Sequence, residues 1–246
     1  MVKSNLDKDK EELIKVIKSA PNYQVLYEGL GKVVDKRREL SRYIWLPESS
    51  SHPELLIAQE VTDQGYTHKK TNKILEKADS FMPTPDLLAE FLRTCKSGKA
   101  YDGNKDKIPK GRLDKILEER GERRNPWRLE HLDHQYSLNK KGQLQVTYHK
   151  FLDGKINLVT ELLDPETLMK DRLPGISLDS YLGNPTSQGL PRKSVKEGSL
   201  WYWFPRKNNV AGFNADADGA YLYCIGGASV SGDSLGVRRA KIFSKK

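Results

Sequence analysis

Apolar residues recur at helical spacing through the first third of the chain. Leu13, Ile14 and Ile17 fall on one face of a helix, and such a stripe predicts an amphipathic helix with one buried side. The other stretches with this spacing are residues 33–44, residues 53–57, which Pro53 can open, and the residues around Ile74 and Leu75. We therefore predict a helical N-terminal region.

The sequence Met-Pro-Thr-Pro at residues 82–85 interrupts this pattern and gives the best domain boundary. We place the helical region at residues 1–83 and a second domain at residues 84–246. Directly after the boundary, Thr84 can cap a helix whose first residue is Pro85. Its buried stripe is Leu87, Leu88, Phe91 and Leu92, and the next helix runs through Leu113, Ile116 and Leu117 to Gly121.

In the middle of the chain the hydrophobic period changes from helical to two. Apolar and polar residues alternate over residues 144–148, which is typical of a half-buried strand. Asp153 and Gly154 then predict the turn of a β-hairpin, and residues 164–198, which are rich in Pro and Gly, are predicted as loops. Helices first and short antiparallel strands later predict an α+β fold.

The 246 residues carry a formal charge of +9, which makes nucleic acid the first partner to consider. The basic residues are scattered, so a solvated surface is the simpler interpretation, and nucleic-acid binding stays the alternative function. Only Cys95 and Cys224 are present. This excludes a disulfide framework but leaves a single bridge open.

The chain shows no signal for a membrane or for export. No apolar run approaches the roughly 20 residues that a membrane span needs. Residues 1–13 are charged where a signal peptide would be apolar. We therefore expect synthesis in the cytoplasm and no membrane insertion, with the virion or the cell surface as open destinations.

The sharpest catalytic motif is Gly-Asp-Ser-Leu-Gly at residues 232–236, which matches the nucleophile elbow of hydrolases and the signature of a lipase family. An elbow needs a strand before the serine, a helix after it and a histidine base later in the chain. The last histidine, His149, precedes Ser234, and residues 237–242 have the pattern of a strand. We therefore interpret the motif as a coincidence and predict no catalytic residue and no cofactor.

Two histidines, His131 and His134, lie beside Glu130 and Asp133 and are candidate metal ligands. Residues three apart on a strand face opposite sides, and no third ligand of suitable spacing follows. We interpret this segment as a polar strand face and predict no metal site.

Trp201, Tyr202 and Trp203 form a dense aromatic cluster. Such a cluster can serve as a platform on which nucleic-acid bases stack. Alternation places both tryptophans on one face of a strand, however, and we predict that this face belongs to the core.

Residues 208–237, called the window below, differ from the rest of the chain. The window contains no Lys, Arg, Glu, Gln, Met, Trp, His, Pro or Thr; its three aspartates give it a charge of −3 and leave the remainder at +12. Small apolar residues alternate with Asn, Asp, Tyr and Ile. Exposed Tyr beside Asn, Asp, Ser and Gly is the composition of an antibody-like binding surface, and a loop rich in Gly, Ala and Ser is the simpler alternative.

The residue types missing from the window also follow a coding rule. Random replacement of the adenines in an AAC or AAT codon can give Asn, Asp, Ser, Gly, Tyr, Ile, Val or Ala. It cannot give Lys, Glu, Gln, Met or Trp, and all five are absent. The composition is therefore that expected of codons diversified at adenines.

Several short motifs in and before the window form a set. Those in the window are Val210-Ala211-x-Phe213-x-Ala215, Ala220-x-Leu222-x-Cys224 and Leu235-Gly236-Val237-Arg238, and those before it are residues 100–104, 126–128, 174–180, 187–191 and 201–203. From about Thr84 to the C-terminus, the chain resembles the variable proteins of diversity-generating retroelements, most closely those of archaeal viruses, archaea and small-genome bacteria. It departs from their pattern at Gly212, Gly219 and Gly226, where Arg is expected.

The resemblance implies a C-type-lectin-like variable domain, related to the scaffold of the formylglycine-generating enzyme, in which a rigid frame displays variable side chains for ligand binding. The oxidase chemistry of that enzyme needs a neighbouring cysteine pair, which Cys224 alone does not supply. We therefore expect no enzyme, and a protein or cell-surface molecule as the ligand.

The resemblance also divides the window into binding and scaffold residues. The implied ligand-binding residues are Asn214, Asp216, Asp218, Tyr221, Tyr223, Ile225, Gly227, Ser229, Val230, Gly232, Asp233 and Ser234. The implied scaffold residues are Phe213, Ala220, Leu222, Cys224, Leu235 and Val237. On this division, replacement of both Tyr221 and Tyr223 by Ala abolishes binding and leaves the melting temperature nearly unchanged.

Overall fold

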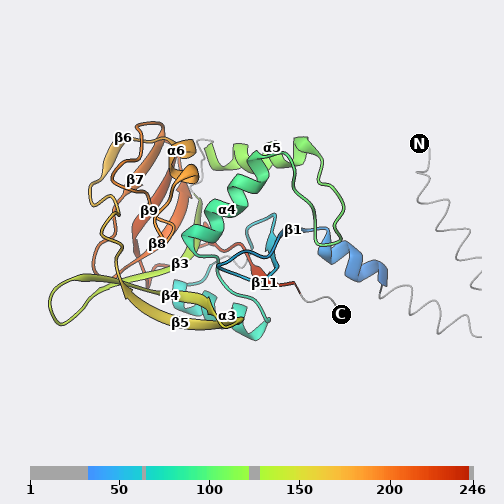
Figure 1. Ribbon diagram of the computed structural model, residues 1–246, viewed down its shortest axis with the longest axis horizontal. Helices are drawn as coiled ribbons and strands as arrows, with labels where there is room; N and C mark the ends of the chain where they lie inside the picture. Colours follow the sequence, from blue (N-terminus) through green and yellow to red (C-terminus); the bar gives the residue numbers. More distant parts are fainter. Residues whose placement is uncertain (1–32, 63–64, 122–127, 244–246) are drawn as a thin grey trace, which may run out of the picture.

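A computed structural model of the chain describes residues 33–62, 65–121 and 128–243. These residues form two β-sheets with helices packed against them (Figure 1), which confirms the predicted α+β class. The helix predicted around residues 13–17 lies outside the described residues. Within the described part of the chain, no helix is long and apolar enough to cross a membrane.

The smaller sheet joins segments from both ends of the chain. Its strands are β1 (Tyr43–Leu46), β2 (Leu55–Ala58) and β11 (Ala240–Ile242), with β2 in the middle. The helix predicted over residues 33–44 is therefore right only as far as residue 40, and the helix predicted over residues 53–57 is wrong. Residues 33–40 are helical, but the chain is extended from Tyr43 and again from Leu55. A strand buried on both faces has a continuous apolar run, which periodicity alone does not distinguish from a buried helix.

The larger sheet contains eight strands of the described chain, in the order β5-β4-β3-β8-β9-β7-β6, with β10 paired to β3 beside this path. β7 pairs with β9, and β10 with β3, in parallel, and the other pairings are antiparallel. The strands are β3 (Arg128–Leu138), β4 (Leu144–Leu152), β5 (Lys155–Leu162), β6 (Arg172–Ile176), β7 (Leu200–Trp203), β8 (Asn209–Ala215), β9 (Ala220–Gly227) and β10 (Leu235–Gly236).

The β4–β5 hairpin forms at the predicted turn. Asp153 and Gly154 have φ angles of 51° and 74°. A two-residue turn of type I′ needs left-handed backbone at both positions, and Gly and Asp adopt it at little cost. The turn residues therefore set the pairing of Leu152 with Lys155 and the register that follows from it.

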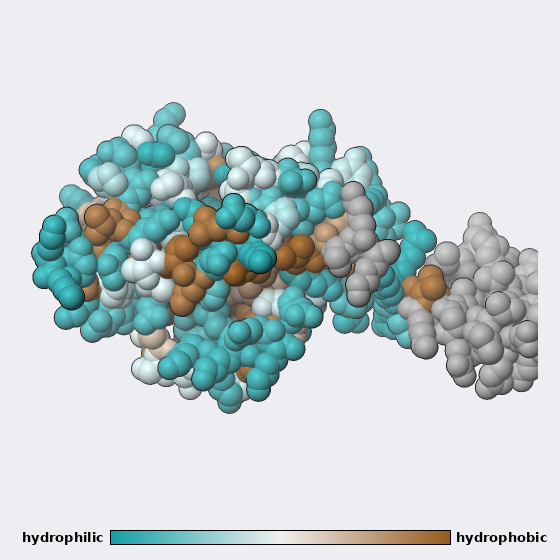
Figure 2. Space-filling view, turned by 60° about the horizontal axis from the view of Figure 1, so that its bottom comes forward, coloured by the Kyte–Doolittle hydropathy of each residue, from teal (hydrophilic) through white to brown (hydrophobic). Residues whose placement is uncertain are grey.

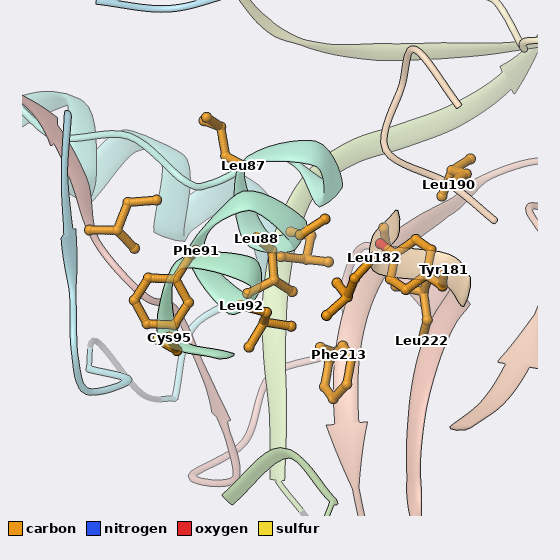
Figure 3. Packing of buried hydrophobic residues seen from close by; sticks show 14 of the residues in the cluster. Leu87, Leu88, Phe91, Leu92, Cys95, Tyr181, Leu182, Leu190, Phe213 and Leu222 are labelled. Atoms are coloured by element: carbon orange, nitrogen blue, oxygen red, sulfur yellow. The ribbon is translucent and has the colours of Figure 1, made fainter. Parts of the chain in front are cut away.

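Three predicted helices are confirmed: α3 (His68–Lys77), α4 (Pro85–Lys96) and α5 (Lys110–Gly121). Thr84 occupies the N-cap of α4 and Pro85 its first turn, where the missing N–H of proline costs nothing. Side chains of α4 point toward Leu182, Phe213 and Leu222 (Figure 3). The large sheet therefore packs against α4.

The loops predicted over residues 164–198 contain two regular elements, β6 and α6 (Leu178–Gly183). The hydroxyl of Ser177 accepts a hydrogen bond from the N–H of Ser180 and caps α6. Gly175 lets β6 approach β7, because a Cβ at this position would lie 1.9 Å from the carbonyl oxygen of Leu200. Elements this short carry too little periodicity to be predicted.

A buried ion pair links the two sheets. The side chains of Arg238 and Glu130 are 1% and 2% exposed, with 3.3 Å between Nε and Oε1. The guanidinium also donates to the carbonyls of Ala58 and Gln59 and lies 4.8 Å from the ring centroid of Phe91. Because Ala58 belongs to β2 and Glu130 to β3, the Arg238 side chain bonds to both sheets.

Candidate binding pocket

The two faces of β9 differ as the alternation predicts. Ala220, Leu222 and Cys224 are buried in the hydrophobic core, and Tyr221 and Tyr223 lie on the other face. The expectation that both tyrosines are exposed is wrong for Tyr221, which is 4% exposed. The six residues expected to be scaffold are all buried: Phe213, Ala220, Leu222, Cys224, Leu235 and Val237. Cys224 and Cys95 do not form the disulfide bridge that the sequence left open.

Four aromatic rings form one continuous cluster on the face of β7 and β9 that is opposite the core. The parallel register places Trp201 beside Tyr221, and Trp203 beside Tyr223. Trp201 stacks on Tyr221 with 5.9 Å between centroids, and Trp203 meets Tyr221 edge-on at 5.0 Å and Tyr223 at 5.7 Å. The ring contacts therefore run without a break across both strands.

These rings form one wall of a cavity of about 360 Å³, which we name the aromatic pocket. A cavity of this size suits a small ligand or a single side chain of a partner. None of the described residues that line it is Lys or Arg. The lining residues are Leu129, His131, Trp201, Trp203, Val210, Ala211, Gly212, Asn214, Asp216, Asp218, Tyr221, Tyr223, Gly226, Gly227, Val230 and Leu235.

The structure brings together seven of the twelve residues that the sequence singles out for ligand binding. Those that line the aromatic pocket are Asn214, Asp216, Asp218, Tyr221, Tyr223, Gly227 and Val230. Those that do not are Ile225, Ser229, Gly232, Asp233 and Ser234. Ser229 lines a second cavity instead.

Trp201 and Trp203 do not belong to the core, and the prediction that they do is wrong. Both are half-buried and line the aromatic pocket, while Tyr202 between them is fully buried. Alternation shows that the two tryptophans share a face but does not show which face meets the core, because both faces are aromatic. The equal spacing of Trp201-x-Trp203 and Tyr221-x-Tyr223 agrees with their pairing but does not by itself predict it.

Asp216 closes the turn between β8 and β9. Its Oδ1 accepts hydrogen bonds from the N–H groups of Asp218 (2.8 Å) and Gly219 (3.3 Å), and its own N–H donates to the carbonyl of Gly219 (2.9 Å). Ala217 is exposed in this turn, so the small apolar face of β8 ends at Ala215. The turn thus holds two carboxylates at the aromatic pocket.

Two buried polar atoms in the lining, Oδ1 of Asn214 and Nδ1 of His131, have no hydrogen-bond partner among the described residues. The other ring nitrogen of His131 lies 3.3 Å from the carbonyl oxygen of Tyr66. Nε2 therefore carries the proton and Nδ1 is an acceptor. Burial lowers the pKa of His131 to about 4, which keeps the imidazole neutral at physiological pH. The aromatic pocket thus contains two unused acceptors.

The polar strand face predicted for residues 130–134 is buried rather than solvated. Its polar residues are at most 3% exposed: Glu130, His131, Asp133 and His134. The pairing of β3 with β8 shifts register between His131 and Gln135, and this bulge turns successive side chains toward different neighbours. Nowhere in the described chain do three His, Cys, Asp or Glu residues form a group that could hold a metal ion.

A second cavity, of about 1130 Å³, is lined by residues of α3 and of the β4–β5 hairpin. In it, Oδ2 of Asp133 accepts hydrogen bonds from Nδ1–H and from the backbone N–H of His149, at 2.8 and 2.6 Å. The hydrogen bond to Asp133 raises the pKa of His149, against an opposing effect of burial. Within the described chain, no serine or cysteine side chain hydrogen-bonds to His149, so the pair lacks an activated nucleophile.

The Gly-Asp-Ser-Leu-Gly motif lies in a turn that leads into β10. The N–H of Leu235 donates to the carbonyl of Gly232 at 2.8 Å and closes this turn. The chain after Ser234 is therefore extended, as predicted, where a nucleophile elbow needs a helix.

Comparison of the chain with protein-family models, with curated proteins and with solved structures finds no match. Function is therefore inferred from the aromatic pocket itself. Its ring faces, carboxylates and unused acceptors are groups that hold a ligand by contact and hydrogen bonding.

Proposed function

We propose that this chain is a non-enzymatic ligand-binding display protein whose window, residues 208–237, is diversified by a retroelement and presented on a rigid C-type-lectin-like frame. The observation that carries the proposal is the division of the window. The six residues expected to be scaffold are buried, and seven of the twelve expected to bind ligand line one cavity. Five of the six scaffold residues stay out of that cavity, and Leu235 lines it.

The frame favours binding because it orders the window before a ligand arrives. β8 and β9 pair with each other and, on their outer sides, with β3 and β7. Asp216 closes the turn between them. A backbone that is already ordered loses little entropy on binding, and Tyr221 and Tyr223 supply contact area with few rotatable bonds.

A display library tests the proposal. Phage carrying the full chain are randomised at five positions of the window and selected against a panel of unrelated proteins. The randomised positions are Asp216, Asp218, Tyr223, Ser229 and Val230. We expect protease-resistant members and specific binders, because these side chains are half-buried or exposed.

The matched control library randomises five exposed positions on the β4–β5 hairpin, and it is expected to fold but to give no binders. Its positions are Lys150, Leu152, Lys155, Asn157 and Thr160. Equal numbers of binders from the two libraries, or loss of folding in the window library, contradict the proposal.

The coding locus gives an independent test. We expect a reverse-transcriptase gene nearby and a second copy of the window's coding sequence that differs only at adenines. A locus without this copy contradicts the retroelement part of the proposal and leaves the binding part to the library.

Nucleic-acid binding is the alternative that the charge of +9 favours. The described lining of the aromatic pocket offers no Lys or Arg for phosphate contacts. Titration of random-sequence DNA at increasing salt separates the two functions, because phosphate contacts give a steep loss of affinity with salt. Tight DNA binding with a steep salt slope, weakened by Trp203→Ala, favours the alternative.

A further inference from the structure

We propose that the aromatic pocket binds a cationic side chain that carries N–H donors, the guanidinium of an arginine or the ammonium of a lysine, from a partner protein. The inference rests on the proposed function, in which this pocket is the ligand site, and adds the chemical class of the ligand. Ring faces, carboxylates and unused acceptors each support it.

The ring cluster provides faces that attract a cation. The plane of Trp203 is inclined by 78° to Tyr221 and by 70° to Tyr223, while Trp201 and Tyr221 lie within 17° of parallel. Trp201 and Trp203 are half-buried and line the aromatic pocket, so a guest in it can contact an indole face. This face carries negative potential, and tryptophan attracts cations more strongly than tyrosine or phenylalanine.

The charges around the aromatic pocket have the sign that a cation needs. Asp216 and Asp218 line it, and none of the described lining residues is Lys or Arg. His131 is neutral at physiological pH because burial lowers its pKa to about 4. The described side chains that line the aromatic pocket therefore carry a net negative charge, in a chain of net charge +9. An anionic ligand would meet two carboxylates and no positive side chain of the described lining.

The unused acceptors distinguish one kind of cation from another. Oδ1 of Asn214 and Nδ1 of His131 are buried, and the described residues offer them no donor. A buried acceptor without a donor is unfavourable, so a ligand that brings N–H groups is preferred. Guanidinium and primary ammonium groups carry such donors, and a fully methylated ammonium carries none. The lining therefore suits Arg or Lys rather than a quaternary ammonium.

Paired peptides test the ligand class on the full chain. The peptide Gly-Gly-Arg-Gly-Gly is compared with the same peptide in which citrulline, of nearly equal shape but without charge, replaces Arg. Tryptophan fluorescence and calorimetry measure the affinities. We expect the Arg peptide to bind about tenfold more tightly, as a desolvated cation–π contact allows. A Lys peptide is expected to bind more tightly than its trimethyllysine counterpart.

A matched pair of variants places the binding in the aromatic pocket. Asp218→Asn is expected to lower the affinity for the Arg peptide about threefold and to leave the affinity for the citrulline peptide unchanged. Asp153→Asn makes the same change of charge in the exposed β4–β5 turn and is expected to alter neither affinity. Equal effects of the two substitutions would show that only the net charge matters and would overturn the inference.

The two proposals fail in different ways. Equal affinity for the Arg and citrulline peptides overturns the ligand class and leaves the pocket as a binding site. The same conclusion follows if neither peptide binds while the window library yields binders. If neither the peptides nor the library give binding, the proposed function fails together with the ligand class.

Discussion

Two hairpins of the same sheet, β4–β5 and β8–β9, use their side chains in opposite ways. In the first, Lys150 and the hydroxyl of Tyr148 both bond to the carboxylate of Glu161, each at 2.8 Å. Thr147 and Thr160 bond to each other at 2.9 Å. These polar groups therefore satisfy one another across the strands. The second hairpin presents the rings of Tyr221 and Tyr223, the carboxylate of Asp218 and the unpartnered Oδ1 of Asn214, which are available to a ligand.

The positions of the two hairpins in the sheet also differ. β8–β9 lies between β3 and β7, whereas β5 forms one end of the strand order among the described residues. Figure 2 shows apolar patches amid a hydrophilic surface on the face that β4 and β5 turn forward, and Leu158 and Leu162 of β5 are 65% and 54% exposed. Exposure is thus greatest on the hairpin whose polar groups are already paired. A rigid, central position, rather than exposure, distinguishes the candidate site.

Truncation of one apolar side chain in each hairpin should give the largest difference in unfolding free energy between the two hairpins. Phe213→Ala should lower the free energy of unfolding by about 3–5 kcal/mol, because Phe213 of β8 is buried against α4 (Figure 3). Leu158→Ala on the exposed face of β5 should change it by less than about 0.5 kcal/mol. Urea denaturation measures both, and similar losses would contradict the central role of β8–β9.

Substitutions of the two tyrosines of β9 should differ in their effect on protein stability, but both should weaken ligand binding. Tyr221 is 4% exposed, so Tyr221→Ala should cost about 2–3 kcal/mol of unfolding free energy. Tyr223 is half-buried, and Tyr223→Ala should cost less than about 1 kcal/mol. Both substitutions should weaken ligand binding.

The burial of Tyr221 changes the expectation, drawn from the sequence, that both rings can be replaced without loss of stability. Tyr221→Phe is the control that keeps the ring and should retain most of the stability. Thermal melts and binding assays on the three variants provide the test, and equal stability losses at Tyr221 and Tyr223 would contradict it.

β3, which pairs with both hairpins, should make the protein sensitive to acid. Burial lowers the pKa of His131 to about 4 and that of His134 to about 3, below the usual value of 6.5. Below pH 6.5 the unfolded chain binds protons that these folded histidines do not. Stability present above that pH is therefore lost as the pH falls toward the folded values. Each histidine should account for a loss of about 1–2 kcal/mol between pH 6.5 and 5.

His134→Phe isolates one of these contributions. The variant keeps an aromatic ring beside Tyr136 and Tyr148, whose rings His134 meets edge-on. Denaturation at a series of pH values should show a shallower decline for the variant than for the wild type. Identical slopes would show that His134 takes up protons as readily in the folded chain as in the unfolded chain.

A small effect on stability is also expected from Lys150→Ala in the β4–β5 hairpin. The Lys150 side chain is 43% exposed, and its pair with Glu161 should contribute less than about 1 kcal/mol. Asp218→Ala in the β8–β9 turn should be equally mild in denaturation but should weaken ligand binding. A binding defect in Lys150→Ala would remove the functional contrast between the hairpins.

Local signals in the sequence predicted those elements that short-range chemistry determines. The Thr84 and Pro85 start of α4, the Asp153 and Gly154 turn and the phase of β9 are all confirmed. β2 is predicted as helical, and one of its two partners, β11, lies near the other end of the described chain. A local pattern does not identify a strand whose apolar residues are buried by segments that are distant in the sequence.

The residues of the candidate site could likewise be predicted only in part from the sequence. The resemblance singles out seven of the lining residues within the window, but Leu129 and His131 come from β3, and Trp201 and Trp203 from β7. Their place in the lining depends on the pairing of β8 with β3 and of β9 with β7. Pairing of strands that are far apart in sequence cannot be deduced from one chain without its structure.

The parallel pairing of β7 with β9 has a consequence for the evolution of such a protein. Trp201 and Trp203 precede residue 208, so two of the four rings are encoded outside the window. In a lineage in which only the window is diversified, every descendant would keep the same two indole rings in the wall of the aromatic pocket. Its repertoire would then be biased from the start, and descendants with unrelated windows would share a weak baseline affinity for the same kind of epitope.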